Sequence, residues 1–75
     1  MNAMDFKKVA AKKLSMFRRG LQSNQQIYLY MFGVIDTLQA LELYTDEHEE
    51  VYKNFTAYLL GTPEVQSKAK EFFFN

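Results

Sequence analysis

The chain has 75 residues, no cysteine and one histidine, and its nine Lys and Arg balance nine Asp and Glu. We expect one small helical domain over residues 1–75. Disulfide bonds and thiolate metal sites are excluded, and a net charge of zero argues against binding to nucleic acid by overall charge alone. Because domains this short have a thin stability margin, association with another chain is a common support for them.

The charges are unevenly distributed along the chain. Residues 1–22 hold six Lys and Arg against one Asp, a net charge of +5. Residues 23–50 hold six carboxylates and no Lys or Arg, a net charge of −6, and residues 51–75 return to +1. We therefore expect an electrically polar molecule with a basic end and an acidic middle.

Residues typical of helix ends divide the chain into four segments. Gly20 can adopt the left-handed conformation that closes a helix, and Ser23 with Gln26 forms a capping box. Thr45 precedes a run of acidic residues that suits a helix start, and Pro63 suits a first helical turn. The predicted fold is all-α, a compact bundle of about four helices. The predicted helices span residues 4–19, 24–44, 46–60 and 63–73.

The segment 24–44 contains the nine-residue apolar run "IYLYMFGVI". A strand at 27–32 is the competing interpretation, but the apolar pattern continues with helical spacing and without a turn residue. As a helix, the segment has two apolar faces and is predicted to be the central hydrophobic helix of the fold. The other helices can cover one face fully and the second in part, so we expect the second face to contact another chain, giving a dimer. The residues expected on this interface are Leu29, Phe32, Gly33, Asp36, Ala40 and Leu43. The alternative is a monomer whose other helices wrap the helix completely.

Two further residues support contact between chains. Asp36 interrupts the second apolar face, and Lys13 similarly interrupts the apolar stripe of the first helix, so the two charges are predicted to pair within or across chains. The alternative is that both reach water at the rim. Phe74 follows two other phenylalanines at the end of the last helix and is expected to be left over from the core, available to a second chain.

Two basic surfaces are candidates for binding nucleic acid. The first helix aligns Lys8, Lys12 and Arg19 on one face with Arg18 beside them, a row that could neutralise phosphates. Its alternative is an ordinary solvated face. The corner at 50–73 resembles a helix-turn-helix, a motif whose second helix enters the major groove of DNA. Its candidate contacts are Gln66, Lys68 and Lys70, and its alternative is a plain helical corner.

Nothing in the sequence indicates catalysis. The acidic cluster Asp46–Glu50, which contains His48, lacks the spacing of a calcium loop or a di-metal site, and a helix dipole explains its carboxylates. No glycine-rich phosphate loop is present. We therefore expect no enzyme activity, no metal, no cofactor and no small-molecule substrate. The apolar run is too short to cross a membrane and the start lacks a secretory signal pattern, so a cytoplasmic location and no membrane partner are expected.

These observations favour a small non-enzymatic regulatory or adaptor protein that acts by protein–protein binding as a homodimer. The alternative is a DNA-binding regulator that uses the basic first helix, the helix-turn-helix-like corner at 50–73, or both.

Overall fold

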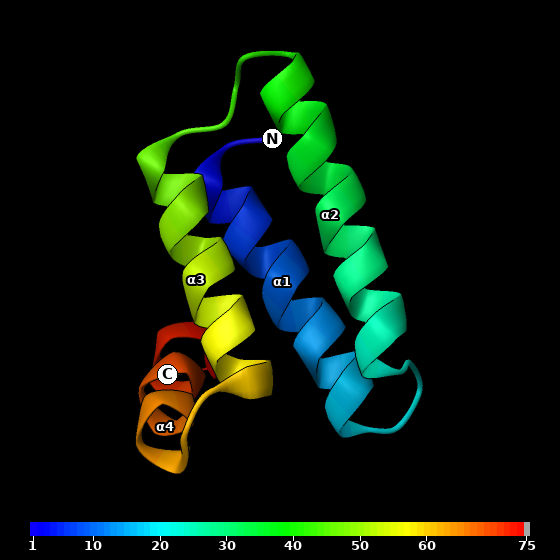
Figure 1. The fold of residues 1–75 in the computed structure, drawn as a ribbon, viewed down its shortest axis with the longest axis vertical. Helices are drawn as coiled ribbons and strands as arrows, with labels where there is room; N and C mark the ends of the chain where they lie inside the picture. Colours follow the sequence, from blue (N-terminus) through cyan, green and yellow to red (C-terminus); the bar gives the residue numbers. More distant parts are fainter. Residues whose placement is uncertain (75) are drawn as a thin grey trace.

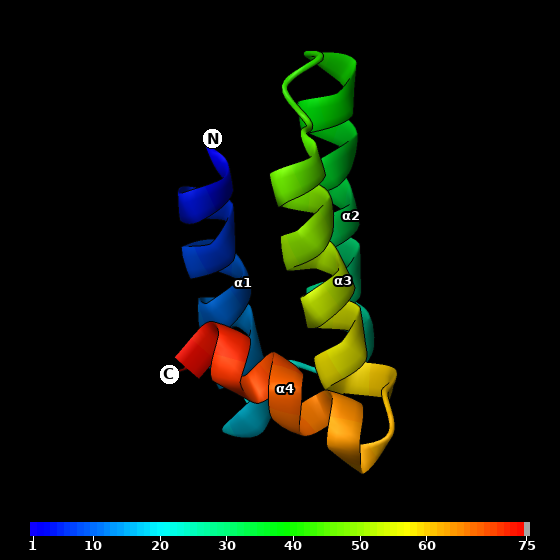
Figure 2. The ribbon, with the colours of Figure 1, turned by 90° about the vertical axis from the view of Figure 1, so that its left-hand side faces the viewer.

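The computed structural model describes residues 1–74, which form four helices and no strand. The helices are α1 (Ala3–Arg18), α2 (Asn24–Ala40), α3 (Asp46–Leu60) and α4 (Pro63–Phe74). Figure 1 shows α1 between α2 and α3, and Figure 2 shows α4 running across the lower ends of α1 and α3. The prediction of an all-α fold of about four helices is confirmed.

The helices begin where side chains satisfy the free amide groups of the first turn. At the start of α2 the Gln26 amide donates to Ser23 Oγ at 3.1 Å, and the Ser23 amide donates to Gln26 Oε1 at 2.7 Å. This reciprocal pair is the expected capping box. At the start of α4 the Val65 amide donates to Thr62 Oγ1 at 3.4 Å, and Pro63 is the first helical residue as predicted.

Both α1 and α2 end in a left-handed residue. Gly20 has a φ of +72°, and the amides after α1 turn back to carbonyls of its last turn. Glu42 has a φ of +58° and forms the same pattern, since its amide donates to the Gln39 carbonyl and the Leu43 amide to the Leu38 carbonyl. The prediction that this helix continues to residue 44 is therefore wrong. A Schellman motif closes α2 at Ala40 without the glycine that usually marks one.

The central helix of the fold is α1, and not the predicted helix 24–44. α1 packs against each of the other three helices, whereas α2 packs mainly against α1. One reason is that α4 packs on α1 as well as on α3, through partly buried phenylalanines of α4 and two cations of α1. Lys7 Nζ lies 4.2 Å from the centre of the Phe72 ring, and the Arg18 guanidinium lies 5.1 Å from that of Phe74. These cation–π contacts attach α4 to a side of α1 that the sequence pattern assigned to solvent.

One hydrophobic core joins the first three helices. α1 and α2 each contribute three buried side chains at helical spacing, and α3 contributes Val51 and Phe55. The core residues of α1 and α2 are Phe6, Ala10, Leu14, Ile27, Met31 and Leu38. Tyr28, Val34 and Ile35 of α2 are partly buried against this core, whereas Leu29, Tyr30 and Phe32 are exposed.

Candidate protein interface

The side of α2 that points away from the core is apolar and exposed. Leu29 is 62% exposed, Phe32 and Leu43 are each 49% exposed, and Gly33 and Ala40 are also on the surface. These are the residues that the sequence assigned to a second apolar face. They are exposed in the single chain, although the Phe32 ring also lies 6.1 Å from that of Tyr52 on α3, and their role as an interface stays a prediction. We call Leu29, Phe32, Gly33, Asp36 and Ala40 the exposed α2 face.

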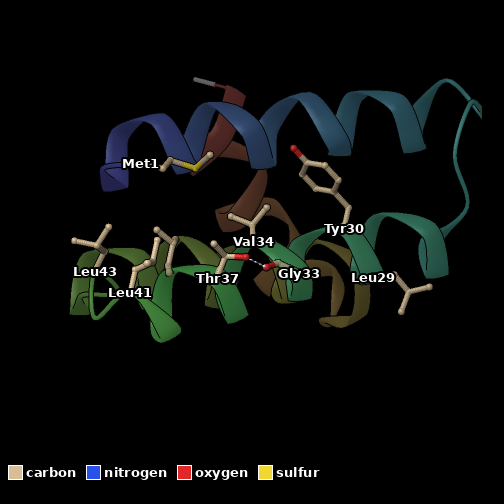
Figure 3. A pocket seen from close by; sticks show the side chains of 9 residues that line it. Met1, Leu29, Tyr30, Gly33, Val34, Thr37, Leu41 and Leu43 are labelled. Atoms are coloured by element: carbon tan, nitrogen blue, oxygen red, sulfur yellow. Dashed lines mark hydrogen bonds between the residues drawn. The ribbon is translucent and has the colours of Figure 1, made fainter.

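A groove overlaps this face at Leu29 and Gly33. It is formed by α2, the two leucines that follow α2, and Met1, and its volume is about 520 Å³. In Figure 3 the side chains of Met1 and Tyr30 lie in the space between α1 and α2, while Leu29, Thr37 and Leu41 lie along α2. The groove is lined by Met1, Leu29, Tyr30, Gly33, Val34, Thr37, Leu38, Leu41 and Leu43. None of these side chains is charged, so the groove suits an apolar occupant.

Two polar side chains on this side of α2 are bonded to nearby backbone groups, whereas the Asp36 carboxylate is exposed. The Thr37 hydroxyl donates to the Gly33 carbonyl at 2.9 Å, which leaves the Thr37 methyl group as the part without a polar partner. Gln26 similarly holds the Ser23 amide. Covering these side chains therefore costs less than covering hydroxyl and amide groups that bond only to water.

Lys13 lies close to the groove but does not contact Asp36. Its amino group is 4.0 Å from the centre of the Tyr30 ring and donates to Gln22 Oε1 at 3.5 Å. Asp36 is exposed on the outer side of α2. The predicted ion pair is therefore wrong within the chain, because the Tyr30 ring and the Gln22 side chain hold the amino group on the α1 side of α2.

Phe74 is also not left over. Its ring packs edge-on against Tyr58 with centroids 6.1 Å apart, and Arg18 lies over it. The prediction of a free Phe74 is wrong because α4 crosses α1 and α3, which gives its last residues two helices to pack on. Phe74 thus contributes to the attachment of α4.

His48 is buried, with 3% of its surface exposed, although the sequence placed it among solvated acids. The Thr45 amide donates to its Nδ1 at 3.1 Å, so Nε2 carries the hydrogen and donates to the Met1 carbonyl at 3.0 Å. The ring also stacks on Tyr44. The sequence signal for this role of His48 is its spacing from Thr45, because a polar residue three positions after the N-cap can complete a capping box. His48 thus ties the start of the chain to α3.

Tyr44 is the most strongly perturbed titratable group of this region. Burial raises its pKa above the ordinary value, and a 2.6 Å hydrogen bond from its hydroxyl to Glu49 Oε2 raises it further. The negative charge of Glu49 acts in the same direction. Both effects favour the neutral phenol, which identifies Tyr44 as a structural donor.

The candidate nucleic-acid contacts lie on two helices. Lys8, Lys12, Arg18 and Arg19 are exposed on or just after α1, and Lys68 and Lys70 are exposed on α4, while Gln66 is half-buried. Arg18 is engaged with Phe74. The α4 residues Gln66 and Lys70 line a second groove of about 550 Å³ together with apolar residues of α1 and α3. Lys8 and Lys12 on α1 and Arg19 just after it are exposed, and their binding to nucleic acid stays a prediction.

Residues 1–74 contain no cluster of three or more side chains suited to holding a metal ion. Across the same residues, no helix combines the length and the apolar character needed to cross a bilayer. Comparisons of the chain with protein-family models, with curated proteins and with solved structures found no match.

Proposed function

We propose that this chain is a small non-enzymatic regulatory or adaptor protein of the cytoplasm that acts by protein–protein binding, as a homodimer. The observation that supports the proposal is the exposed α2 face, with the apolar groove that overlaps it. Soluble monomers rarely expose a contiguous apolar patch of several hundred Å² unless it binds something. In a domain this small the hydrophobic core alone provides little stability, and burial of apolar surface in an interface adds to it.

The first test is the mass of the protein in solution with and without a charge on this face. Leu29→Glu and Phe32→Glu place carboxylates where the proposal puts the contact, so sedimentation equilibrium should change from two chains to one. Circular dichroism and thermal melting should show that the variants remain folded. Leu60→Glu is the matched control, because Leu60 is 67% exposed at the end of α3 and far along the chain from this face. A wild-type mass of one chain at all concentrations, together with no protein bound through Leu29 or Phe32, would refute the proposal.

The second candidate function is that of a DNA-binding regulator. It is supported by the exposed row of Lys8, Lys12 and Arg19 on α1 and by the exposed lysines Lys68 and Lys70 on α4. Binding through phosphates weakens linearly with the logarithm of salt concentration. Replacing Lys8, Lys12 and Arg19 by Gln should therefore lower the affinity for duplex DNA and flatten its salt dependence. If wild-type protein shows no salt-dependent retention of DNA, this candidate is excluded.

A further inference from the structure

The exposed side of α2 carries a row of uncharged residues on both sides of Gly33. Residues at positions −7, −4, +4 and +7 from Gly33 lie on the same side of the helix, because steps of three and four residues return to one face. These residues are Gln26, Leu29, Thr37 and Ala40. We call them, with Gly33, the α2 seam. All five residues are exposed and none is charged, so this side of α2 can pack against a second helix.

From this pattern, and resting on the protein-binding function proposed above, we propose that the α2 seam binds the same seam of a second copy of this chain, antiparallel, with a two-fold axis beside Gly33. In such an interface each residue contacts a counterpart whose number, added to its own, gives about 66, twice 33. Gly33 therefore meets Gly33 of the other copy, Leu29 meets Thr37, and Gln26 meets Ala40.

Gly33 is suited to the centre of this contact. It lies one residue from the midpoint of α2, so an antiparallel pairing there overlaps almost the whole helix. A Cβ atom added at Gly33 would meet nothing within 4 Å, so no packing inside this chain explains a glycine at this position. Glycine within a helix is unfavourable relative to alanine, but it allows another backbone to approach closely.

The charges favour the antiparallel over the parallel arrangement. Figure 1 places the end of α2 and the start of α3 at one end of the molecule, and the turn from α1 to α2 at the other. The first end carries the five carboxylates of residues 42–50, whereas residues 6–35 contain no carboxylate and include Arg18 and Arg19 near the second end. Antiparallel copies bring acidic ends beside basic ends, while parallel copies would align like charges.

The exposed apolar side chains of α2 and of the turn after it supply part of the area that a small dimer requires. Leu29, Tyr30, Phe32, Leu41 and Leu43 are each between 44% and 62% exposed. With roughly 200 Å² for each such side chain when fully exposed, they present on the order of 500 Å². A standard interface buries about 800 Å² on each partner. The seam residues Gly33, Thr37 and Ala40 add further surface to the side chains around them.

Cross-linking of introduced cysteines can test the arrangement, because the chain has no cysteine of its own. A disulfide forms only where two Cα atoms lie within about 7 Å. The cysteines are therefore placed away from Gly33, where the two backbones meet, and the proteins are oxidised mildly. Leu29→Cys alone and Thr37→Cys alone should stay mostly monomeric in denaturing gels, whereas an equal mixture of these two variants should cross-link. Lys68→Cys, exposed on α4, is the control that reports random collision.

The outcomes separate this proposal from the protein-binding function on which it rests. Self-cross-linking of Leu29→Cys as efficient as cross-linking of the Leu29→Cys and Thr37→Cys mixture would show a parallel pairing and overturn the proposal. A mass of two chains with no cross-link from any seam variant would overturn this arrangement and leave the homodimer standing. A monomer whose α2 face captures a different protein would overturn the second copy as occupant and leave protein binding standing.

Discussion

Replacement of Gly33 by alanine should have opposite effects on folding and on association. Within one chain the new methyl group enters open space, since nothing lies within 4 Å of the added Cβ. Alanine is favoured over glycine inside a helix by roughly 0.5 to 1 kcal/mol. Gly33→Ala should therefore raise the free energy of unfolding of the monomer by that amount, which shifts the melting temperature of a domain this size by several degrees.

In the dimer the same methyl group is an obstruction. The two-fold axis duplicates it, so two methyl groups would stand where two glycine backbones meet. Overpacking of this kind typically costs about 1 to 3 kcal/mol. At about 1.4 kcal/mol for each tenfold change, the dissociation constant should rise between about fivefold and one hundredfold.

Both effects can be measured on one pair of proteins. Thermal unfolding below the dissociation constant reports on the monomer, where association does not contribute to the measured stability. Sedimentation equilibrium over a range of concentrations reports on the dimer. Gln39→Ala is the matched control, because Gln39 is exposed on the same helix about 120° around from Gly33. An alanine variant that is more stable as a monomer and dimerises as well as wild type would refute the placement of Gly33 at the contact.

Three further predictions concern the turns on either side of α2 and the start of α3. Glu42→Gly should raise the free energy of unfolding by about 0.5 to 1 kcal/mol, because a left-handed conformation is costly for residues with a Cβ. For the same reason Gly20→Ala should lower it by a similar amount, and a denaturant titration measures both changes. His48→Ala should lower the free energy of unfolding by about 2 to 3 kcal/mol, because it removes a helix cap, a second hydrogen bond of the ring and buried packing. His48→Gln keeps only the capping hydrogen bond, so chemical denaturation should show that it recovers part of that loss. Burial and Glu49 raise the pKa of Tyr44 in the folded state. The contribution of Tyr44 to the free energy of unfolding is therefore intact below the pKa of about 10 that tyrosine has in the unfolded chain, and it is lost as the pH rises beyond that value. Between pH 9 and 11 the melting temperature of Tyr44→Phe should fall less steeply with pH than that of wild type. An equal slope for the two proteins would contradict this reasoning.

The helix starts were predictable because their signals are local. Ser23 with Gln26 and the Thr62-Pro63 pair specify a helix start through bonds that span three residues, and the structure contains both. The end of α2 was not predictable by the same means. Glu42 occupies a position where glycine is usual, so the pattern of the sequence continued while the backbone turned. A residue that adopts the left-handed conformation although its side chain disfavours it gives no local sequence signal for the end of a helix.

The arrangement of the helices was less predictable than their bounds. Lys7 and Arg18 look like solvated residues in the sequence, but their cations lie over Phe72 and Phe74 and attach α4 to α1. His48 looks like a member of an acidic surface, but it is buried against the start of the chain. In each case a polar group packs on an aromatic ring or a backbone carbonyl distant in sequence, and periodicity contains no information on such contacts.

The exposed α2 face follows from these same contacts. Since α4 packs on the basic side of α1 through Phe72 and Phe74, it is not available to cover α2, and the helix with the most apolar sequence lies at the edge of the fold. Only Ile27, Met31 and Leu38 of α2 are buried, although its apolar residues extend around the helix. A second copy that covers the outer side would stabilise the folded chain by mass action, since it binds that face only when the face is formed. Dimerisation and folding are then linked, so charge substitutions at Leu29 should lower the melting temperature most at high protein concentration, where wild type is dimeric. Melting temperatures of wild type and Leu29→Glu that differ by the same amount at all concentrations would show that Leu29 acts within the monomer alone.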